Sequence, residues 1–190
     1  EVNMDNRKKV PLKNKLAYGI GTGGGNVFSQ IAAAFLLNYY TDTALIGAGA
    51  IATMFLVCRV FDGITDLLMG GIVDKTSTRL GKARPWLIAS APLSLLGIVL
   101  LMNVPMGLGE NGKLVYAYIT YIFMSCIVYT IYGISNTALL PLMTHDKDDS
   151  TMLATFSALG NNIIGLIAGS LITPLVLNLG WKTSSIILGF

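Results

Sequence analysis

Repeated long apolar runs constrain what this chain can fold into more than any other feature of its sequence. A helix that crosses a membrane needs about 20 mostly apolar residues. The sequence holds five complete runs of that kind and the beginning of a sixth. The expected spans lie at roughly 17–40, 45–73, 86–105, 114–140, 152–178 and 183–190, the last of them incomplete. We therefore predict an all-α, multi-span membrane protein.

The composition supports this class. Hydrophobic residues make up 53% of the chain and charged residues only 12%, with a mean hydropathy of +0.65. A soluble domain usually has about 25% charged residues, so this chain has too few to cover a water-soluble globule. A porin-type barrel is excluded as well, because its strands alternate in polarity and are only about 10 residues long.

Positive charges alternate between the connecting segments and predict the orientation. Residues 1–16 and the loop after the second span are rich in lysine and arginine. The loop after the fourth span is mainly acidic around Lys147, and the alternate loops hold only Lys113 and Lys182. Basic segments stay in the cytoplasm. We expect 1–16 to be a cytoplasmic N-terminal segment and 17–190 an N-terminal transmembrane bundle, in the plasma (inner) membrane.

The two ends of the sequence suggest a longer protein. The first residue is Glu1 rather than methionine, and the last apolar run stops at Phe190 before it is long enough to span. We therefore expect this chain to be about the first half of a larger protein, whose C-terminal bundle is absent from the sequence.

Three charged residues lie inside the second apolar run, in the stretch CRVFDGITDLLMGG. Arg59, Asp62 and Asp66 are three and four residues apart, which places them on one face of a helix. A charge at the bilayer centre costs about 2.5 to 3.5 kcal/mol, so this face should meet other helices or a water-filled cavity. Arg59 can pair with Asp62, which leaves Asp66 as a surplus carboxylate suited to one hard cation or proton. The alternative interpretation is a static ion-pair lock between helices.

Other spans carry polar stripes that could meet this charged face. The stripes are Tyr18, Thr22, Asn26 and Gln30 in the first span, Ser125, Tyr129, Thr130, Asn136 and Thr137 in the fourth, and Thr155, Ser157, Asn161 and Asn162 in the fifth. Each residue alone could be an interhelical contact worth about 0.6 kcal/mol. Together they favour a water-accessible path and hence a transporter. The glycine-rich stretch GIGTGGGN lies inside a span, where it indicates close helix packing rather than phosphate binding.

The sequence carries none of the usual signatures of an enzyme. It has no P-loop, no dinucleotide fingerprint and no nucleophile motif. Cys58 and Cys126 lack partners at ligand spacing, and the only histidine, His145, stands at a loop beside Asp146. We expect no catalytic activity, no cofactor, no metal beyond a coupling cation and no nucleic-acid partner. The expected partners are a small-molecule solute, the coupling cation and the lipid bilayer.

Four stretches resemble a known family: KLAYGIGTGGGN, NYYTD, FLVCRVFDGITDLLMGGIVDKTSTRLGKARPW and YTIYGI. They are similar to the glycoside–pentoside–hexuronide:cation symporters, the melibiose-permease group of the major facilitator superfamily. The resemblance covers about 15–174 and is most specific in the second span, where Arg59, Asp62 and Asp66 precede Met-Gly and a basic loop ending in Arg-Pro-Trp. It implies two six-span bundles and alternating access, with this chain as the N-terminal bundle, cut within the sixth span. The implied activity is symport of a sugar or glycoside with Na+, Li+ or H+.

The resemblance also implies roles for individual residues. Asp62 and Asp66 would bind the coupling cation with help from Thr130, and Arg59 would be their charge partner. The stretch GGIVDKTSTRLGKARP resembles the superfamily's cytoplasmic loop, whose charge contacts hold the inner gate shut and break on opening. The residues of this gate loop would be Asp74, Arg79, Gly81 and Arg84.

The solute site matches the family less well. The family's first-span aspartate is Asn26 here, its fourth-span aspartate is Gly133, and its fifth-span arginine has no counterpart in TMLATFSALGNN. We expect a substrate path along Tyr18, Asn26, Tyr129 and Gly133, and an altered substrate: another glycoside, an anionic sugar or a solute outside the sugars. Two alternatives remain, a proton-coupled major facilitator carrier of a non-sugar solute or lysolipid, and a non-transporting membrane sensor or scaffold.

Overall fold

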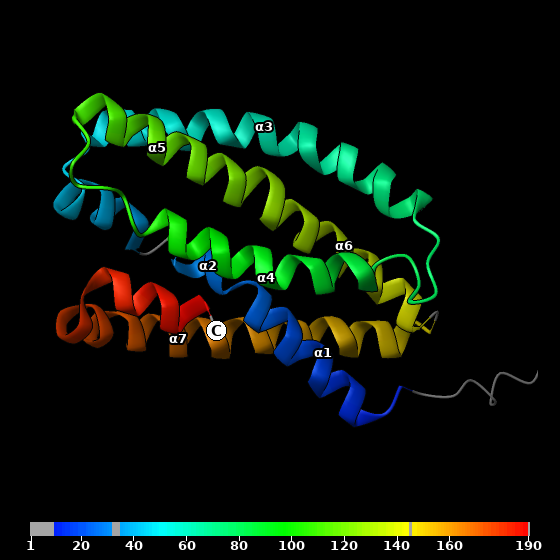
Figure 1. Ribbon diagram of the computed structural model, residues 1–190. Coiled ribbons are helices and arrows are strands. Elements are labelled where there is room, and N and C mark those ends of the chain that lie inside the picture. The colour runs from blue at the N-terminus through cyan, green and yellow to red at the C-terminus, as the bar shows by residue number, and fades with distance from the viewer. Residues whose placement is uncertain (1–9, 32–34, 145, 190) are drawn as a thin grey trace, which may run out of the picture.

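The computed structural model describes residues 10–31, 35–144 and 146–189. Every regular element in these ranges is a helix, which confirms the all-α class predicted from the apolar runs. Figure 1 shows the long helices lying side by side in a bundle, with their axes roughly parallel or antiparallel. Residues 1–9 of the expected cytoplasmic segment, and His145, lie outside the described residues.

The helical elements have well-defined bounds. In chain order they are α1 (Leu12–Gly25), α2 (Val27–Ile31), the π-helix η3 (Tyr39–Thr43), α3 (Ala48–Lys75), α4 (Arg84–Leu101), α5 (Glu110–Ile122), the π-helix η4 (Phe123–Tyr129), α6 (Thr130–Met143) and α7 (Lys147–Gly189). Within the described residues, three helical stretches are long and apolar enough to cross a membrane: Arg84–Leu101, Glu110–Met143 and Lys147–Trp181. The second of these joins α5, η4 and α6 end to end.

The packing order places α6 and α4 in the middle of the bundle. Helix α6 contacts α3 and α4, whereas α7 packs along α1 and also contacts α4. In Figure 1, α3 and α7 accordingly lie at opposite sides of the bundle. The larger buried apolar cluster lies where the η3 region, α3, α4 and η4 meet. Helix α7 bends back on itself at Gly180, whose φ of 73° is a backbone conformation that suits glycine.

The first apolar run differs in detail from the single helix expected at 17–40. Helix α1 already begins at Leu12, directly after Pro11, and proline suits the start of a helix because its fixed φ is compatible with the first turn. The helix ends at Gly25, at the end of a run of glycines that weakens helical structure. After Asn26 the chain continues into α2. The polar stripe of the first span is therefore divided between two helical segments.

Glycines let α1 and α7 approach to backbone contact. A Cβ placed on Gly19 would lie 2.5 Å from the carbonyl oxygen of Phe156, and one on Gly23 would lie 2.5 Å from that of Gly160. A Cβ on Gly160 would overlap the carbonyl of Gly19 in return. The stretch GIGTGGGN is thus a close-packing surface, as its position inside an apolar run predicted.

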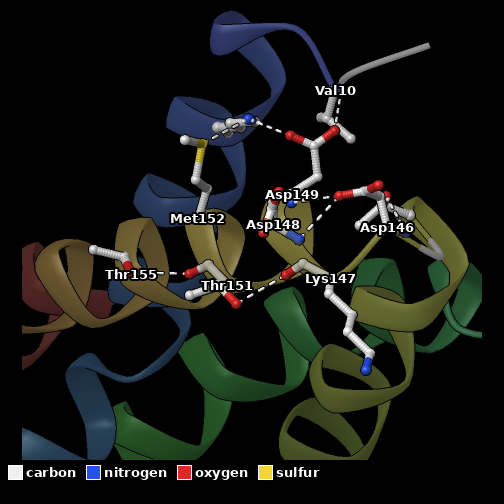
Figure 2. Close-up of polar contacts among 10 residues, drawn as sticks. Val10, Asp146, Lys147, Asp148, Asp149, Thr151, Met152 and Thr155 are labelled. Carbon is white, nitrogen blue, oxygen red and sulfur yellow. Dashed lines mark hydrogen bonds and ion pairs between the residues drawn. The ribbon is translucent and has the colours of Figure 1, made fainter. Parts of the chain in front are cut away.

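A buried ion pair ties the beginning of α1 to the beginning of α7. The Lys15 Nζ atom lies 2.6 Å from Asp149 Oδ1, and the two side chains are only 8% and 6% exposed. The other carboxylate oxygen of Asp149 accepts a hydrogen bond of 2.7 Å from the Val10 amide, as Figure 2 shows. Asp146 Oδ1 accepts the amides of Asp148 and Asp149 and so caps α7. This corner fixes α1 to α7 at one end of the bundle.

The outer surface of the helices is strongly apolar. Leu67, Leu166 and Leu177 are 80%, 75% and 80% exposed. Large exposed apolar surfaces are rare on soluble monomers, whereas helices with apolar exteriors are what a lipid bilayer accommodates. The arrangement is that of a membrane protein, in agreement with the apolar runs of the sequence.

Candidate functional site

Helix α3 carries all three charges of the second apolar run, but they do not pair as the sequence suggested. Asp62 is half-buried, whereas Arg59 and Asp66 are exposed. The Ser125 hydroxyl of η4 lies 3.0 and 3.2 Å from the two carboxylate oxygens of Asp62 and donates to them. Among the residues that the structure describes, neither Arg59 nor Asp66 forms an ion pair or hydrogen bond. The carboxylate of Asp62 is held by a neutral hydroxyl in place of the expected arginine.

Thr130 lies beside the same part of α3. It is the first residue of α6, its side chain is buried, and its Oγ1 lies 3.4 Å from Oγ1 of Thr65. Thr65 follows Asp62 by three residues and directly precedes Asp66. Thr130 therefore lies beside the stretch of α3 that holds both carboxylates. Its contact there is the hydroxyl of Thr65, a residue that the sequence analysis did not single out. Thr65 could have been predicted from its position three residues after Asp62, because residues three apart are neighbours on a helix surface.

The π-helix η4 positions the fourth span against α3. Ser125 contacts the Asp62 carboxylate, and the neighbouring Cys126 Sγ lies 3.9 Å from the carbonyl oxygen of Cys58, one helical turn before Asp62. A π-helix has wider turns than an α-helix, and such segments occur frequently at functional sites. Two consecutive residues of η4 thus engage the same face of α3.

A second polar network joins the first, fourth and fifth apolar runs. Asn26 donates from Nδ2 to Oδ1 of Asn161 at 2.9 Å and to the Thr22 carbonyl at 3.0 Å. Its Oδ1 atom accepts a hydrogen bond of 3.1 Å from the Tyr129 hydroxyl. Both Nδ2 protons and the oxygen of Asn26 are therefore used within the bundle. Tyr129 ends η4 and precedes Thr130, so this network lies one residue along the chain from the Thr65–Thr130 contact.

Tyr18 belongs to a different part of the interior. Together with Thr22, Ser90, Tyr132 and Asn136 it lines a cavity of about 480 Å³ between α1, α4 and α6. Its hydroxyl lies 3.5 Å from the Asn136 carbonyl oxygen. Gly133 has open space beside it, since a Cβ placed there would meet no atom within 4 Å. The four residues expected on the substrate path thus divide into the cavity around Tyr18, the network of Asn26 and Tyr129, and the space at Gly133.

The expected gate loop forms an ordered turn between α3 and α4. Gly81 has a φ of 95°, and the Thr78 hydroxyl donates to its carbonyl oxygen at 2.8 Å. Arg79, Gly81 and Arg84 line a second cavity of about 940 Å³, whose other walls are the start of α1 and the end of α6. Asp74 lies at the end of α3, and no ion pair joins it to either arginine within the described ranges.

Long apolar helices that carry a half-buried carboxylate and enclose hydroxyls and amides define a membrane protein with a polar interior, the class to which solute carriers belong. Comparison with known proteins identifies the family within this class. The chain belongs to the family described as MFS/sugar transport protein, which it matches over residues 17–189. The resemblance to the glycoside–pentoside–hexuronide:cation symporters is thereby confirmed.

Individual relatives are similar along nearly the whole of this chain. It is 32% identical to the uncharacterized symporter YnaJ of Bacillus subtilis (strain 168), over 97% of this chain and 42% of that protein. It is 34% identical to the glucuronide carrier protein homolog of Escherichia coli (strain K12), over 90% and 37%. It is 29% identical to the isoprimeverose transporter of Lactiplantibacillus pentosus, over 94% and 37%. The chain spans about two fifths of the length of these relatives.

Proposed function

We propose that this chain is the N-terminal half of a secondary active transporter that couples the uptake of a sugar or glycoside to Na+, Li+ or H+. The second half would be a C-terminal bundle, and the solute would pass between the two halves by alternating access. The carrier would lie in the plasma (inner) membrane with its N-terminus in the cytoplasm, as the basic residues of 1–16 favour. The observation that carries this proposal is the Asp62 carboxylate, which accepts a hydrogen bond from Ser125 and lies one helical turn before Asp66, with the Thr65–Thr130 contact between them.

In this proposal Asp62 and Asp66 bind the coupling cation, and Thr130 assists. Hard cations such as Na+ prefer oxygen ligands, which carboxylates and hydroxyls supply. Arg59 contacts neither carboxylate in the described structure, but its charge on the same helix leaves the three residues with one net negative charge, which one cation or proton neutralises. An uncompensated charge in a closed, lipid-surrounded core costs several kcal/mol. Cation binding therefore lowers the cost of changing the access side for the carrier loaded with solute.

The solute would bind along Tyr18, Asn26, Tyr129 and Gly133. Asn26 is neutral, and Gly133 leaves open space where a larger side chain could stand. Neither position presents a carboxylate that would repel an anion. Among the similar proteins are a glucuronide carrier protein homolog and an isoprimeverose transporter. Both names support a sugar as the solute, and the neutral path is compatible with a sugar that carries an acid group.

The loop between α3 and α4 would act as the inner gate. Its charged residues, Asp74, Arg79 and Arg84, are exposed. They are free to form charge contacts with the second bundle, and Gly81 provides the turn that presents them. These contacts would break on the cytoplasmic side while solute and cation are bound. Their loss would open the path to the cytoplasm.

The first test is the melting temperature of the purified full-length carrier in Na+, Li+ and choline, for the wild type and for Asp66→Asn. A ligand at 100 times its dissociation constant stabilises the bound protein by about 2.7 kcal/mol. We expect Na+ or Li+ to raise the melting temperature of the wild type but not of Asp66→Asn, and the variant to lose cation-driven solute accumulation. Glu110→Gln, at the exposed start of α5, is the matched control and should behave as the wild type.

Other results would contradict the proposal in distinct ways. Retained accumulation with unchanged cation dependence in Asp66→Asn would remove this carboxylate from the coupling site. A wild type that responds to pH but to neither metal cation would contradict the expected stabilisation by Na+ or Li+ and would leave H+ as the coupling ion. A wild type that responds to Na+, Li+ and pH in no measurement would favour a static charged lock in a sensor or scaffold.

A further inference from the structure

We propose that Ser125 is a positioning residue of the cation site, whose hydroxyl fixes the Asp62 carboxylate in the orientation that binds the coupling cation. This inference rests on the proposed function. The sequence placed Ser125 in a polar stripe of the fourth span but gave it no role. Its contact with Asp62 joins residues 63 positions apart in the chain.

The position of Ser125 is set by its surroundings. Its side chain is only 8% exposed, and it belongs to η4, where the adjacent Cys126 Sγ approaches the Cys58 carbonyl of α3. Asp62 follows Cys58 by one helical turn. The two contacts together fix both the height and the rotation of η4 relative to the carboxylate. The hydroxyl therefore does not reach Asp62 as a flexible surface side chain would.

The hydrogen-bonding capacity of a hydroxyl explains what it does there. A serine has one O–H proton and two lone pairs, so the contacts of 3.0 and 3.2 Å are one proton shared between both oxygens of Asp62. This shared hydrogen bond holds the two carboxylate oxygens in one orientation. The same contact leaves lone pairs on Oγ, and oxygen lone pairs are what Na+ and Li+ use as ligands.

Na+ titrations of the full-length carrier test this role, with melting temperature and solute uptake as readouts. In Ser125→Ala we expect the half-maximal Na+ concentration to rise about tenfold, the factor that corresponds to 1.4 kcal/mol. Solute affinity at saturating Na+ should change less than twofold. Ser125→Cys, with its weak S–H donor, should resemble Ser125→Ala, whereas Ser125→Thr keeps the hydroxyl and should resemble the wild type.

Ser135→Ala is the matched control, because Ser135 lies in the same apolar run, is fully buried, and has no hydrogen-bond partner for its hydroxyl in the described structure. It should leave the Na+ dependence unchanged. An Na+-responsive wild type whose Na+ titration is unchanged in both Ser125→Ala and Ser125→Cys would overturn the role of Ser125 alone. A wild type that is indifferent to Na+, Li+ and pH would overturn the proposed function and this inference together.

Discussion

Replacing Gly160 with alanine is expected to separate α1 from α7 and to lower the stability of the protein by about 3 kcal/mol, the upper end of the usual range for overpacking. The added methyl group would overlap the carbonyl and Cα atoms of Gly19. These are backbone atoms of a helix, so no side-chain rotation can make room for the methyl group. The neighbouring contact between Gly23 and Gly160 prevents a local shift of either helix.

Gly169→Ala is the control for the Gly160 substitution. Gly169 lies on the same helix α7, and a Cβ there would meet no atom within 4 Å. Alanine favours helix over glycine by up to about 1 kcal/mol, so this variant should be as stable as the wild type or slightly more stable. The measurement is the melting temperature of both variants in the same detergent. Equal melting temperatures for Gly160→Ala and Gly169→Ala would show that α1 and α7 do not pack at backbone distance.

The close approach of α1 and α7 illustrates how far the sequence alone could lead. A run of glycines inside an apolar stretch predicts a tight helix contact, because small residues allow backbones to approach. The sequence did not identify α7 as the partner, since Gly19 and Gly160 are far apart in the chain and come together only through the fold. The all-α class was predictable for a related reason, because long apolar runs leave a chain few other structures in lipid.

The candidate cation site shows where such prediction stops. The helical period correctly placed Arg59, Asp62 and Asp66 on a single helix, but it could not indicate which neighbour each side chain meets. Opposite charges suggested that Arg59 would hold Asp62, whereas the structure supplies the Ser125 hydroxyl. Ser125 reaches the carboxylate from a π-helix, and the 3.6-residue period by which helices are recognised contains no signal for a π-helix.

The N-terminal basic residues give a similar lesson. Lys15 contributed to the positive charge that predicted a cytoplasmic segment, and Asp149 to an acidic loop after the fourth span. From the charge pattern alone, both Lys15 and Asp149 are expected in solvated segments. In the structure they are buried against one another, because α1 and α7 begin at the same end of the bundle. Pairing of this kind depends on tertiary arrangement, which charge counts do not contain.

Asp149→Ala is expected to lower the stability by about 3 to 5 kcal/mol, the usual cost of leaving one partner of a buried ion pair uncompensated. Lys15 would keep its charge in a position that is only 8% exposed, with the Met152 sulfur, 3.2 Å away, as its remaining contact in the described residues. The Val10 amide would lose its acceptor as well. Melting temperature in detergent measures the loss. Asp148→Asn, at the exposed position one residue earlier, should have little effect.

A combined variant separates the charge of this pair from its packing. Lys15→Met with Asp149→Leu removes both charges and keeps apolar volume in the same space, and buried pairs replaced in this way are often as stable as before or more stable. We therefore expect the double variant to recover most of the stability that Asp149→Ala loses. If it were as unstable as the single variant, the hydrogen bond from Val10 to Asp149, rather than the ion pair, would be what holds the first turn of α1 against α7. A single variant within about 1 kcal/mol of the wild type, the usual limit for surface pairs, would show that the pair is solvated.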